Sequence, residues 1–400
     1  DWEEGDGLDL ENYTDLTKNG SGSNWIRASK AAAWTSVGGD YHADPAYIQY
    51  FTGGLGNLDV DITALVEQWI AGSKSNYGVG VRLTASNEAY FSSSAGVDSG
   101  SVIQNPNGAK TSYYTKRFFA RGSQYFFKRP VIEARWDSTT QDDRAAFYFS
   151  SSLATKSENL NTLYLYNYAR GKLRNIPSVG TGHIYVSLYS GSSDNTEPSG
   201  SKLVLYDAET AMTGGHHDTG IYTCSVALTK STSVTLETLY DVWHDNDGTE
   251  FFTGSIKPYT LRGSTHAREP TYYLSITNLQ NSYMRDQNAR FNLYVREKNW
   301  SPTIYTKAIA SAPTETIYSA SYRVIRTIDG LEAVPFYTGS SNKHATGLSY
   351  DVSGNYFDLD MSLLEPGYEY AFKFAFYDDE LGSWQEQNEQ FKFRVDDYEH

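Results

Sequence analysis

Seven carboxylates stand before the first lysine, Lys18, so the chain opens with a concentration of oxygen ligands. Ca²⁺ takes about six to eight oxygen ligands and would cancel the mutual repulsion of such a group. No D-x-D-x-D-G loop is present there; the nearest sequence, at 245–248, would put the first ligand position on Trp243. We therefore keep two interpretations of the opening, a calcium site at Asp6, Asp9 and Asp15 or a solvated acidic loop, and predict no other cofactor.

Two adjacent histidines, His216 and His217, precede Asp218 and follow two glycines. Neighbouring side chains on a strand point to opposite faces, so both imidazoles reach one metal only from a loop. The glycines favour a loop, but a zinc site needs three or four ligands and no third is marked. The sequence predicts a surface loop without a metal.

Residues for covalent or acid-base catalysis do not converge in this sequence. A nucleophilic serine would stand in a Gly-x-Ser-x-Gly turn that leads from a strand into a helix, and no helix follows the Gly-Ser turns here. The pair Asp142-Asp143 has the chemistry of a glycosidase pair, as do many pairs in any acidic β protein. We predict that the protein is not an enzyme.

Cations alternate with rings between Lys116 and Arg129, a combination that also stacks single-stranded bases. The chain carries 33 Lys+Arg against 48 Asp+Glu, a net charge of −15, which repels polyanions. We interpret the segment as a strand with an aromatic face in the core and a basic face outside, and predict no nucleic-acid partner.

Tyrosine is unusually frequent, with 33 residues, and offers flat amphipathic surface for protein contacts or sugar stacking. Alternation along strands would place some of these rings, and some tryptophans, on outer faces. The candidate binding residues are the exposed aromatics Trp25, Trp34, Tyr113 and Tyr114. The sequence leaves open whether they meet protein or glycan.

Period-two alternation runs through most of the chain, as at 162–168, 182–189 and 371–377, and indicates half-buried strands joined by Gly, Asn and Asp turns. The stretch 61–71 differs, because Ile62, Leu65, Val66, Trp69 and Ile70 recur at helical spacing. Asp61 is suited to cap its start and Gly72 to follow its end. We predict an all-β protein of tandem antiparallel β-sandwiches with one short helix.

Four hundred residues exceed what one core normally holds, which is about 250–300. The stretch 128–137 is predicted to be the last strand of the first domain, and polar linkers follow it and recur near 261–265. The predicted domains are 1–137, 138–263 and 264–400. A single cysteine, Cys224, excludes an internal disulfide framework, and no apolar run reaches the ~18–20 residues of a membrane span.

The first domain resembles a known module. Asp61-Ile62-Thr63 through Trp69, Asn76-Tyr77-Gly78 and Arg129-Pro130-Val131-Ile132 are similar to the second half of a DNRLRE-type β-sandwich module, which occurs in bacterial surface proteins, carbohydrate-binding modules and phage structural proteins. The module's first strands would precede Asp1. The resemblance therefore implies a truncated or processed start.

Nearly the whole chain, including 118–122, 299–302, 348–357 and 391–395, resembles an uncharacterised virion structural protein of marine tailed phages. The resemblance implies a non-enzymatic tail, fibre, neck or capsid-decoration subunit of the extracellular particle. It would act by adhesion to other virion subunits, as a homo-oligomer, with a host-surface glycan as a further possible partner. The alternative is a cell-surface carbohydrate-binding protein.

The sequence Leu364-Glu365-Pro366-Gly367-Tyr368-Glu369-Tyr370 resembles the tyrosine corner of fibronectin III and related immunoglobulin-like domains. The resemblance implies that Tyr370 is buried and returns its hydroxyl to a nearby backbone group. It implies an immunoglobulin- or fibronectin III-like sandwich for the third region, and we predict an immunoglobulin-like sandwich for the second region as well. Tyr370 is thus a packing residue rather than a binding residue.

Overall fold

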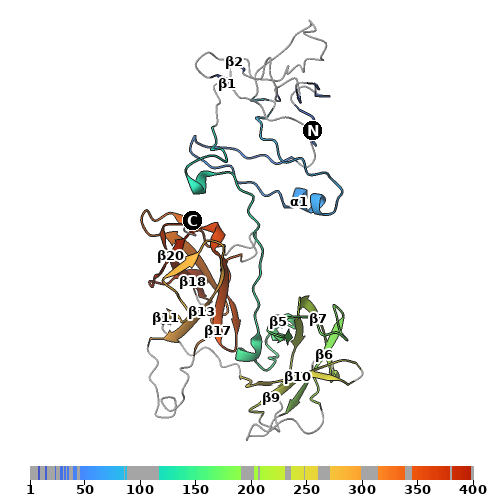
Figure 1. Ribbon diagram of the computed structural model, residues 1–400. Coiled ribbons are helices and arrows are strands. Elements are labelled where there is room, and N and C mark those ends of the chain that lie inside the picture. The colour runs from blue at the N-terminus through green and yellow to red at the C-terminus, as the bar shows by residue number, and fades with distance from the viewer. Residues whose placement is uncertain are drawn as a thin grey trace. The chain divides into compact units, whose positions relative to one another are not determined.

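The structure is a computed structural model of the 400-residue chain. It describes residues 8–9, 14–15, 23, 28–29, 31–32, 34–35, 39–42, 46–84, 86–87, 117–190, 202–205, 208–229, 236–246, 248–259, 271–298, 314–337, 345–378 and 381–397. The chain divides into two compact units, 1–120 and 121–400 (Figure 1). The boundaries predicted at 137 and 263 stay predictions.

The first unit contains two short paired strands, β1 (Leu8–Asp9) and β2 (Thr14–Asp15), and the helix α1 (Thr63–Ile70). The helix occurs where the sequence predicts it, but its N-cap is Ile62 rather than Asp61. Asp61 instead accepts the amide of Thr63 through Oδ1 at 2.9 Å, and Gly72 ends the helix with φ +68°.

No residue of α1 is fully buried. Its predicted apolar stripe is half-buried at Leu65, Val66 and Trp69, whereas Ile70 is 82% exposed, which corrects the prediction for that residue. In the part of the chain that is described, no helix is long and apolar enough to span a bilayer.

The second unit begins with a 3₁₀ turn, η1 (Phe126–Lys128), where the sequence predicted a strand. Phe126 and Phe127 pack edge to face with ring centroids 5.1 Å apart, and Phe127 packs against a core of the second unit. The prediction was wrong because adjacent rings that meet each other cannot alternate between two faces of a sheet.

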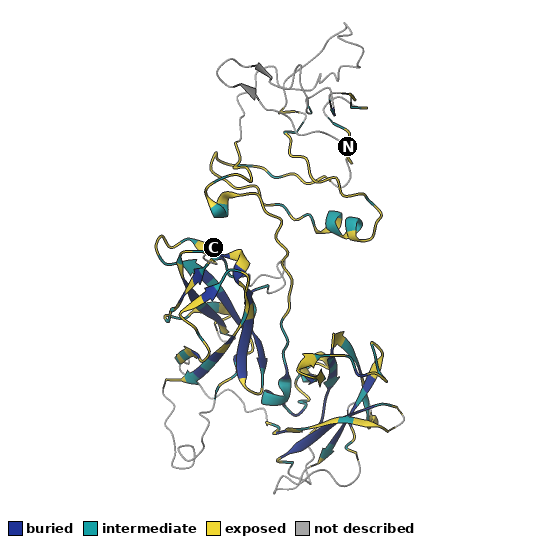
Figure 2. Ribbon diagram, in the orientation of Figure 1, coloured by how far each residue is buried: buried dark blue, intermediate teal, exposed yellow. Residues whose placement is uncertain are grey.

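Residues 128–137 were predicted to form a strand and do not. Beyond η1 they run as an extended stretch that pairs with no strand in the described structure, and Figure 2 draws most of it as exposed. The alternating pattern is present, but a strand also requires a neighbouring backbone. We call residues 129–142 the connector.

The connector leads into what we call the middle domain, whose core comes from residues 147–256. Its elements are η2 (Asp143–Ala146), η3 (Ser157–Asn159), β3 (Asn161–Tyr166), β4 (Tyr168–Ala169), β5 (Lys172–Leu173), β6 (His183–Ser190), β7 (Met212–Asp218), β8 (Ile221–Val226), β9 (Leu239–His244) and β10 (Glu250–Ile256).

Six of these strands form one antiparallel sheet in the order β10-β9-β6-β7-β8-β3. Residues 147–150 bridge the chain that follows β8, at Thr229, and the chain that follows β10, at Tyr259. These bridges help the sheet to enclose a mainly aliphatic core. The core also includes Trp243 and Tyr222, which are completely buried.

The C-terminal domain, as we call the part with its core at 276–395, packs two sheets face to face. One sheet has the order β11-β13-β17-β16 and the other β12-β20-β18-β14-β15, with β19 paired to β18. All pairs are antiparallel except β12 with β20. The elements are β11 (Tyr272–Ile276), β12 (Ser282–Met284), β13 (Asn288–Glu297), β14 (Ala320–Arg326), β15 (Glu332–Val334), β16 (Ser349–Asp351), β17 (Gly354–Asp360), η5 (Met361–Leu363), β18 (Glu369–Asp378), β19 (Ser383–Glu386) and β20 (Phe391–Asp396).

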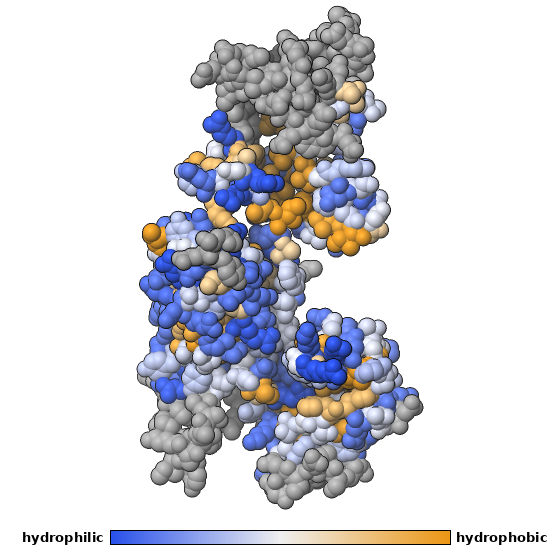
Figure 3. Space-filling model, viewed as in Figure 1, coloured by the Kyte–Doolittle hydropathy of each residue, from blue (hydrophilic) through white to orange (hydrophobic). Residues whose placement is uncertain are grey.

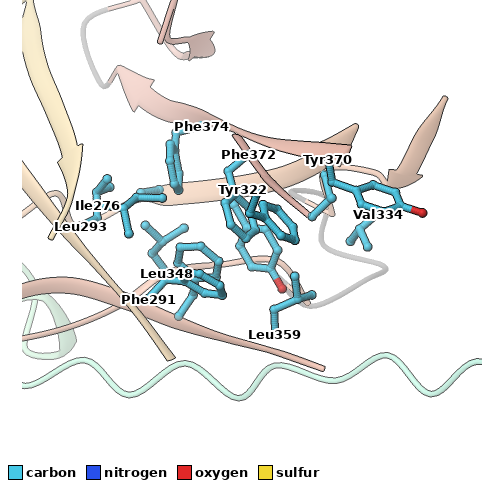
Figure 4. Close-up of a cluster of buried hydrophobic side chains, with 14 of the residues drawn as sticks. Ile276, Phe291, Leu293, Tyr322, Val334, Leu348, Leu359, Tyr370, Phe372 and Phe374 are labelled. Carbon is cyan, nitrogen blue, oxygen red and sulfur yellow. The ribbon is translucent and has the colours of Figure 1, made fainter. Parts of the chain in front are cut away.

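Aromatic rings fill the space between these sheets (Figure 4). Phe291 stacks on Phe357 at 5.1 Å, and Phe372 stacks on Phe393 at 4.5 Å. The predicted tyrosine corner is confirmed: Tyr370 is fully buried and its hydroxyl donates to the carbonyl of Glu365 at 2.8 Å. The described chain is therefore all-β with one short α-helix, as the sequence predicts.

Candidate functional site: the junction between two β domains

The end of the connector pairs with the edge of the C-terminal domain. The amide of Asp142 donates to the carbonyl of Tyr350 at 3.0 Å, and the amide of Tyr350 donates to the carbonyl of Thr140, also at 3.0 Å. The amide of Thr140 donates to Ser349 Oγ. Residues 140–142 therefore extend the sheet beyond its edge strand, β16, by a parallel bridge.

Asp143 joins the two domains through its two carboxylate oxygens. Oδ2 accepts the amide of Thr162 in β3 of the middle domain at 2.6 Å, and Oδ1 accepts the hydroxyl of Tyr350 in β16 of the C-terminal domain at 2.8 Å. Asp142 caps the turn η2 by accepting the amide of Arg144. A short turn thus places one carboxylate between two sheets.

Arg144 holds a second, deeper group of charges in the middle domain. It donates from Nη1 to Asp142 Oδ2 at 2.7 Å, and from Nη2 and Nε to Asp241 Oδ2 at 2.6 and 3.1 Å. Trp243 Nε1 donates to the same Asp241 oxygen at 2.8 Å. Asp241 is completely buried, so this guanidinium is the charge that compensates it.

The backbone around Asp241 leaves no spare room for a side chain. A Cβ atom added to Gly254 in β10 would lie 2.6 Å from Asp241 Oδ1, so glycine is required where β10 crosses the carboxylate. That Oδ1 atom has no hydrogen-bond partner within the described chain.

Burial changes the proton affinities of the junction carboxylates. It raises the pKa of Asp142 from its ordinary 3.8 to about 6, against the opposing attraction of Arg144. It also raises the pKa of Asp143, while the bonds from Thr162 and Tyr350 act in the opposite direction. In Tyr350, burial and then the neighbouring Asp143 raise the pKa of the phenol, so Tyr350 remains the hydrogen-bond donor.

Tyrosines from both domains surround the charges. Tyr318 packs edge to face on Tyr350 with centroids 5.5 Å apart, within the C-terminal domain. The pKa of Tyr318 is raised by burial and by a hydrogen bond with Tyr148 of the middle domain. Likewise, burial and then Tyr356 of the C-terminal domain raise the pKa of Tyr166. Many tyrosines are therefore used where the domains meet.

Asp142 and Asp143 hold parts of the structure together through hydrogen bonds and an ion pair. A glycosidase pair would expose two carboxyl groups to a substrate. Here Asp142 is 3% exposed and bonded to Arg144, and Asp143 is occupied on both oxygens. Neither carboxylate is presented to a substrate.

A second pair, Ser187 and His244, has the contacts of a catalytic dyad. Ser187 Oγ lies 2.9 Å from His244 Nε2, and His244 Nδ1 lies 2.8 Å from the carbonyl of Asp245. Ser187 is completely buried and His244 nearly so, which keeps substrates away. The sequence gives no signal for this pair, because the two residues lie on different strands, β6 and β9.

His216 and His217 lie on the strand β7, which corrects the predicted loop. His216 packs edge to face on Tyr222 and His217 on Tyr164, so the two rings have separate partners. The preceding Gly214 is needed for close packing, since a Cβ there would lie 2.4 Å from the carbonyl oxygen of Thr223. Gly214 therefore marks a close approach of strands, not a loop.

The remaining predicted site residues are mostly untested. Trp25, Tyr113, Tyr114 and Asp6 lie outside the described residues. Trp34 is half-buried. Asp9 and Asp15 end the paired strands β1 and β2, where Asp9 is opposite Thr14 and Leu8 opposite Asp15. Within the described ranges no cluster of ligands suits a metal ion, and the calcium prediction stays a prediction.

Comparison with known proteins adds no family. No protein-family model matches the chain, and no curated protein matches it. Among solved structures, a titin fragment is 8% identical, with 63% of this chain and 93% of that one covered, at a TM-score of 0.17. A tyrosine-to-glycine mutant of Salmonella alpha-2-macroglobulin is 7% identical, with 60% of this chain and 14% of that one covered, also at 0.17.

Proposed function

We propose that the protein is a non-enzymatic structural subunit of a tailed phage particle, which acts by adhesion to other subunits. The observation that carries the proposal is the junction, where Asp143 and the paired end of the connector tie two β domains together. A structural subunit needs domains that keep their geometry under load, and such contacts serve that need. The carboxylates of greatest chemical interest are used in these contacts.

The exposed surface fits the same role. The face of the C-terminal domain seen in Figure 3 is mainly hydrophilic. The surface of this domain also carries exposed rings such as Tyr273, which is 50% exposed. Arg296 and Lys298 lie over the Tyr273 ring at 5.1 and 5.4 Å. Rings arranged in this way suit contacts between proteins.

The direct test is the presence of the protein in purified particles. Mass spectrometry of density-gradient particles, with labelled antibody in electron microscopy, is expected to find the protein in constant proportion to the major capsid protein. If it occurs in the infected lysate and is absent from particles, the proposal is wrong. Binding on a glycan array by the purified chain, together with that absence, would favour the carbohydrate-binding alternative.

A further inference from the structure

The connector exposes three large apolar side chains. Between η1 and the paired residues 140–142, Val131, Ile132 and Trp136 are 78%, 74% and 63% exposed. The backbone of residues 130–134 and 136–138 makes no hydrogen bond within the described chain. Free strand edges with apolar side chains are templates for pairing with another strand.

The two faces of this stretch differ. Tyr337 of the C-terminal domain donates to Glu133 Oε1 at 3.4 Å, and the guanidinium of Arg135 lies 4.5 Å from the centre of the Tyr337 ring. Within the same chain, Arg135 Nη2 donates to Glu133 Oε2 at 2.9 Å, so a ribbon would add a second, cross-strand partner to each charge. Side chains alternate along an extended backbone. Ile132, Ala134 and Trp136 therefore lie on the face opposite to this contact.

The sequence of the stretch is complementary to itself when two copies run antiparallel with Ala134 at the centre. Ile132 then lies opposite Trp136 of the second copy, and Glu133 lies opposite Arg135 of the second copy. Cross-strand pairs of rings with branched side chains and of opposite charges stabilise sheets. Each pair occurs twice, as two-fold symmetry requires.

Three other alignments are less favourable. Centring the pair on Glu133 or on Arg135 places like charges directly opposite each other, and a parallel pairing in register does the same for both residues. Charge therefore favours the alignment centred on Ala134 over these three.

We propose that residues 130–138 pair antiparallel with the same residues of a second copy of this chain and form a two-stranded ribbon that joins two subunits. The inference rests on the proposed function, because it names the surface through which one structural subunit binds another. The ribbon would pair the backbone of 130–134 and 136–138, which makes no hydrogen bond within the described chain, and bring the apolar face of each copy beside that of the other.

Site-specific cross-linking of the full chain tests the register. In Ala134→Cys the two new thiols face each other across the ribbon at Cα distances of about 4.5–5.5 Å, which a disulfide spans. Under mild oxidation this variant is expected to form covalent dimers in most molecules. Leu153→Cys, 97% exposed in the middle domain, is the control and is expected to stay largely monomeric; the native Cys224 is buried in both.

Charge reversal tests the pairing independently. Glu133→Arg and Arg135→Glu each place like charges opposite each other twice and are expected to raise the dimer dissociation constant by roughly tenfold or more in sedimentation experiments. The double variant restores opposite charges and is expected to restore dimerisation. A dimer that is unaffected by either single reversal would overturn the register.

A monomeric Ala134→Cys chain would overturn the proposal, and so would protection from hydrogen exchange at residues 131–136 in a monomer, since that shows pairing within one chain. Failure of the ribbon is distinguishable from failure of the proposed function. A chain that is found in particles but does not cross-link at Ala134 keeps the function and loses the ribbon. A chain that cross-links at Ala134→Cys but is absent from particles supports the ribbon and contradicts the proposed function.

Discussion

The middle domain and the C-terminal domain solve the problem of a core in different ways. The C-terminal domain places stacked rings between two sheets, with Phe291, Phe357, Phe372 and Phe393 at its centre. The middle domain wraps one sheet around aliphatic side chains and buries the ion group of Arg144 and Asp241 beside them. No charged side chain is buried among the described residues of the C-terminal domain, whereas the middle domain buries charges that depend on compensation.

The largest effect is expected from a substitution in the aromatic core of the C-terminal domain. Phe372→Ala is expected to lower the free energy of unfolding of the C-terminal domain by about 3–5 kcal/mol, because the ring is fully buried between four aromatic neighbours. Leu153→Ala, at a side chain that is almost fully exposed, is expected to change it by under about 0.5 kcal/mol. Denaturant unfolding followed by fluorescence measures both.

Removing the buried cation tests the charged core. Arg144→Met leaves Asp142 and Asp241 without compensation, and is expected to destabilise the middle domain by about 3 kcal/mol. Arg394→Met removes an exposed partner of Asp396 and is expected to cost under about 1 kcal/mol. If the two variants lower the unfolding free energy equally in urea, Asp142 and Asp241 do not depend on Arg144 for compensation of their buried charge.

The raised pKa of Asp142, about 6, gives the junction a pH dependence. Because the folded state holds this proton more tightly than the unfolded chain, the contribution is favourable below about pH 4 and is lost as the pH rises through 6. The unfolding free energy of Asp142→Asn lacks this pH dependence. Its difference from the wild-type value is therefore expected to shift by roughly 2–3 kcal/mol in favour of the variant between pH 4 and pH 7. Parallel pH profiles of unfolding free energy would contradict the assignment.

The smallest effect compares two tyrosine hydroxyls. Tyr350→Phe removes the bond to Asp143 across the junction, and Tyr370→Phe removes the bond to the Glu365 carbonyl inside the C-terminal domain. Each is expected to cost about 1–2 kcal/mol. Only Tyr350→Phe is expected to separate the melting transitions of the two domains in calorimetry, and separation by Tyr370→Phe as well would argue against a specific role for the junction.

The sequence predicts a strand or turn well where burial of one face of that element determines its residue pattern. The alternation at 162–168, 182–189 and 371–377 corresponds to β3, β6 and β18, and the tyrosine corner forms as the resemblance implies. The pattern at 128–137 has the same alternation, but among the described residues no strand pairs with it. Pairing depends on where the rest of the chain lies, and a local pattern does not contain that information.

The junction could not be predicted for a related reason. Asp143 and Tyr350 are 207 residues apart, and Arg144 and Asp241 are 97 apart. A pair such as Asp142-Asp143 looks like many other acidic pairs until the fold brings a tyrosine to one carboxylate and a guanidinium to the other. The prediction at His216 failed differently, because Gly214 is needed for a close approach between strands, which the sequence pattern does not contain.

The most direct test of the central claim, that the junction holds the middle and C-terminal domains as one unit, is a distance distribution between them. Spin labels at Leu153→Cys and Ile328→Cys, both on exposed positions, report it by pulsed electron resonance, since Cys224 is buried. The account predicts one narrow distribution in the otherwise unchanged chain and broadening when Asp143→Ala is added. A broad distribution that Asp143→Ala leaves unchanged would contradict it.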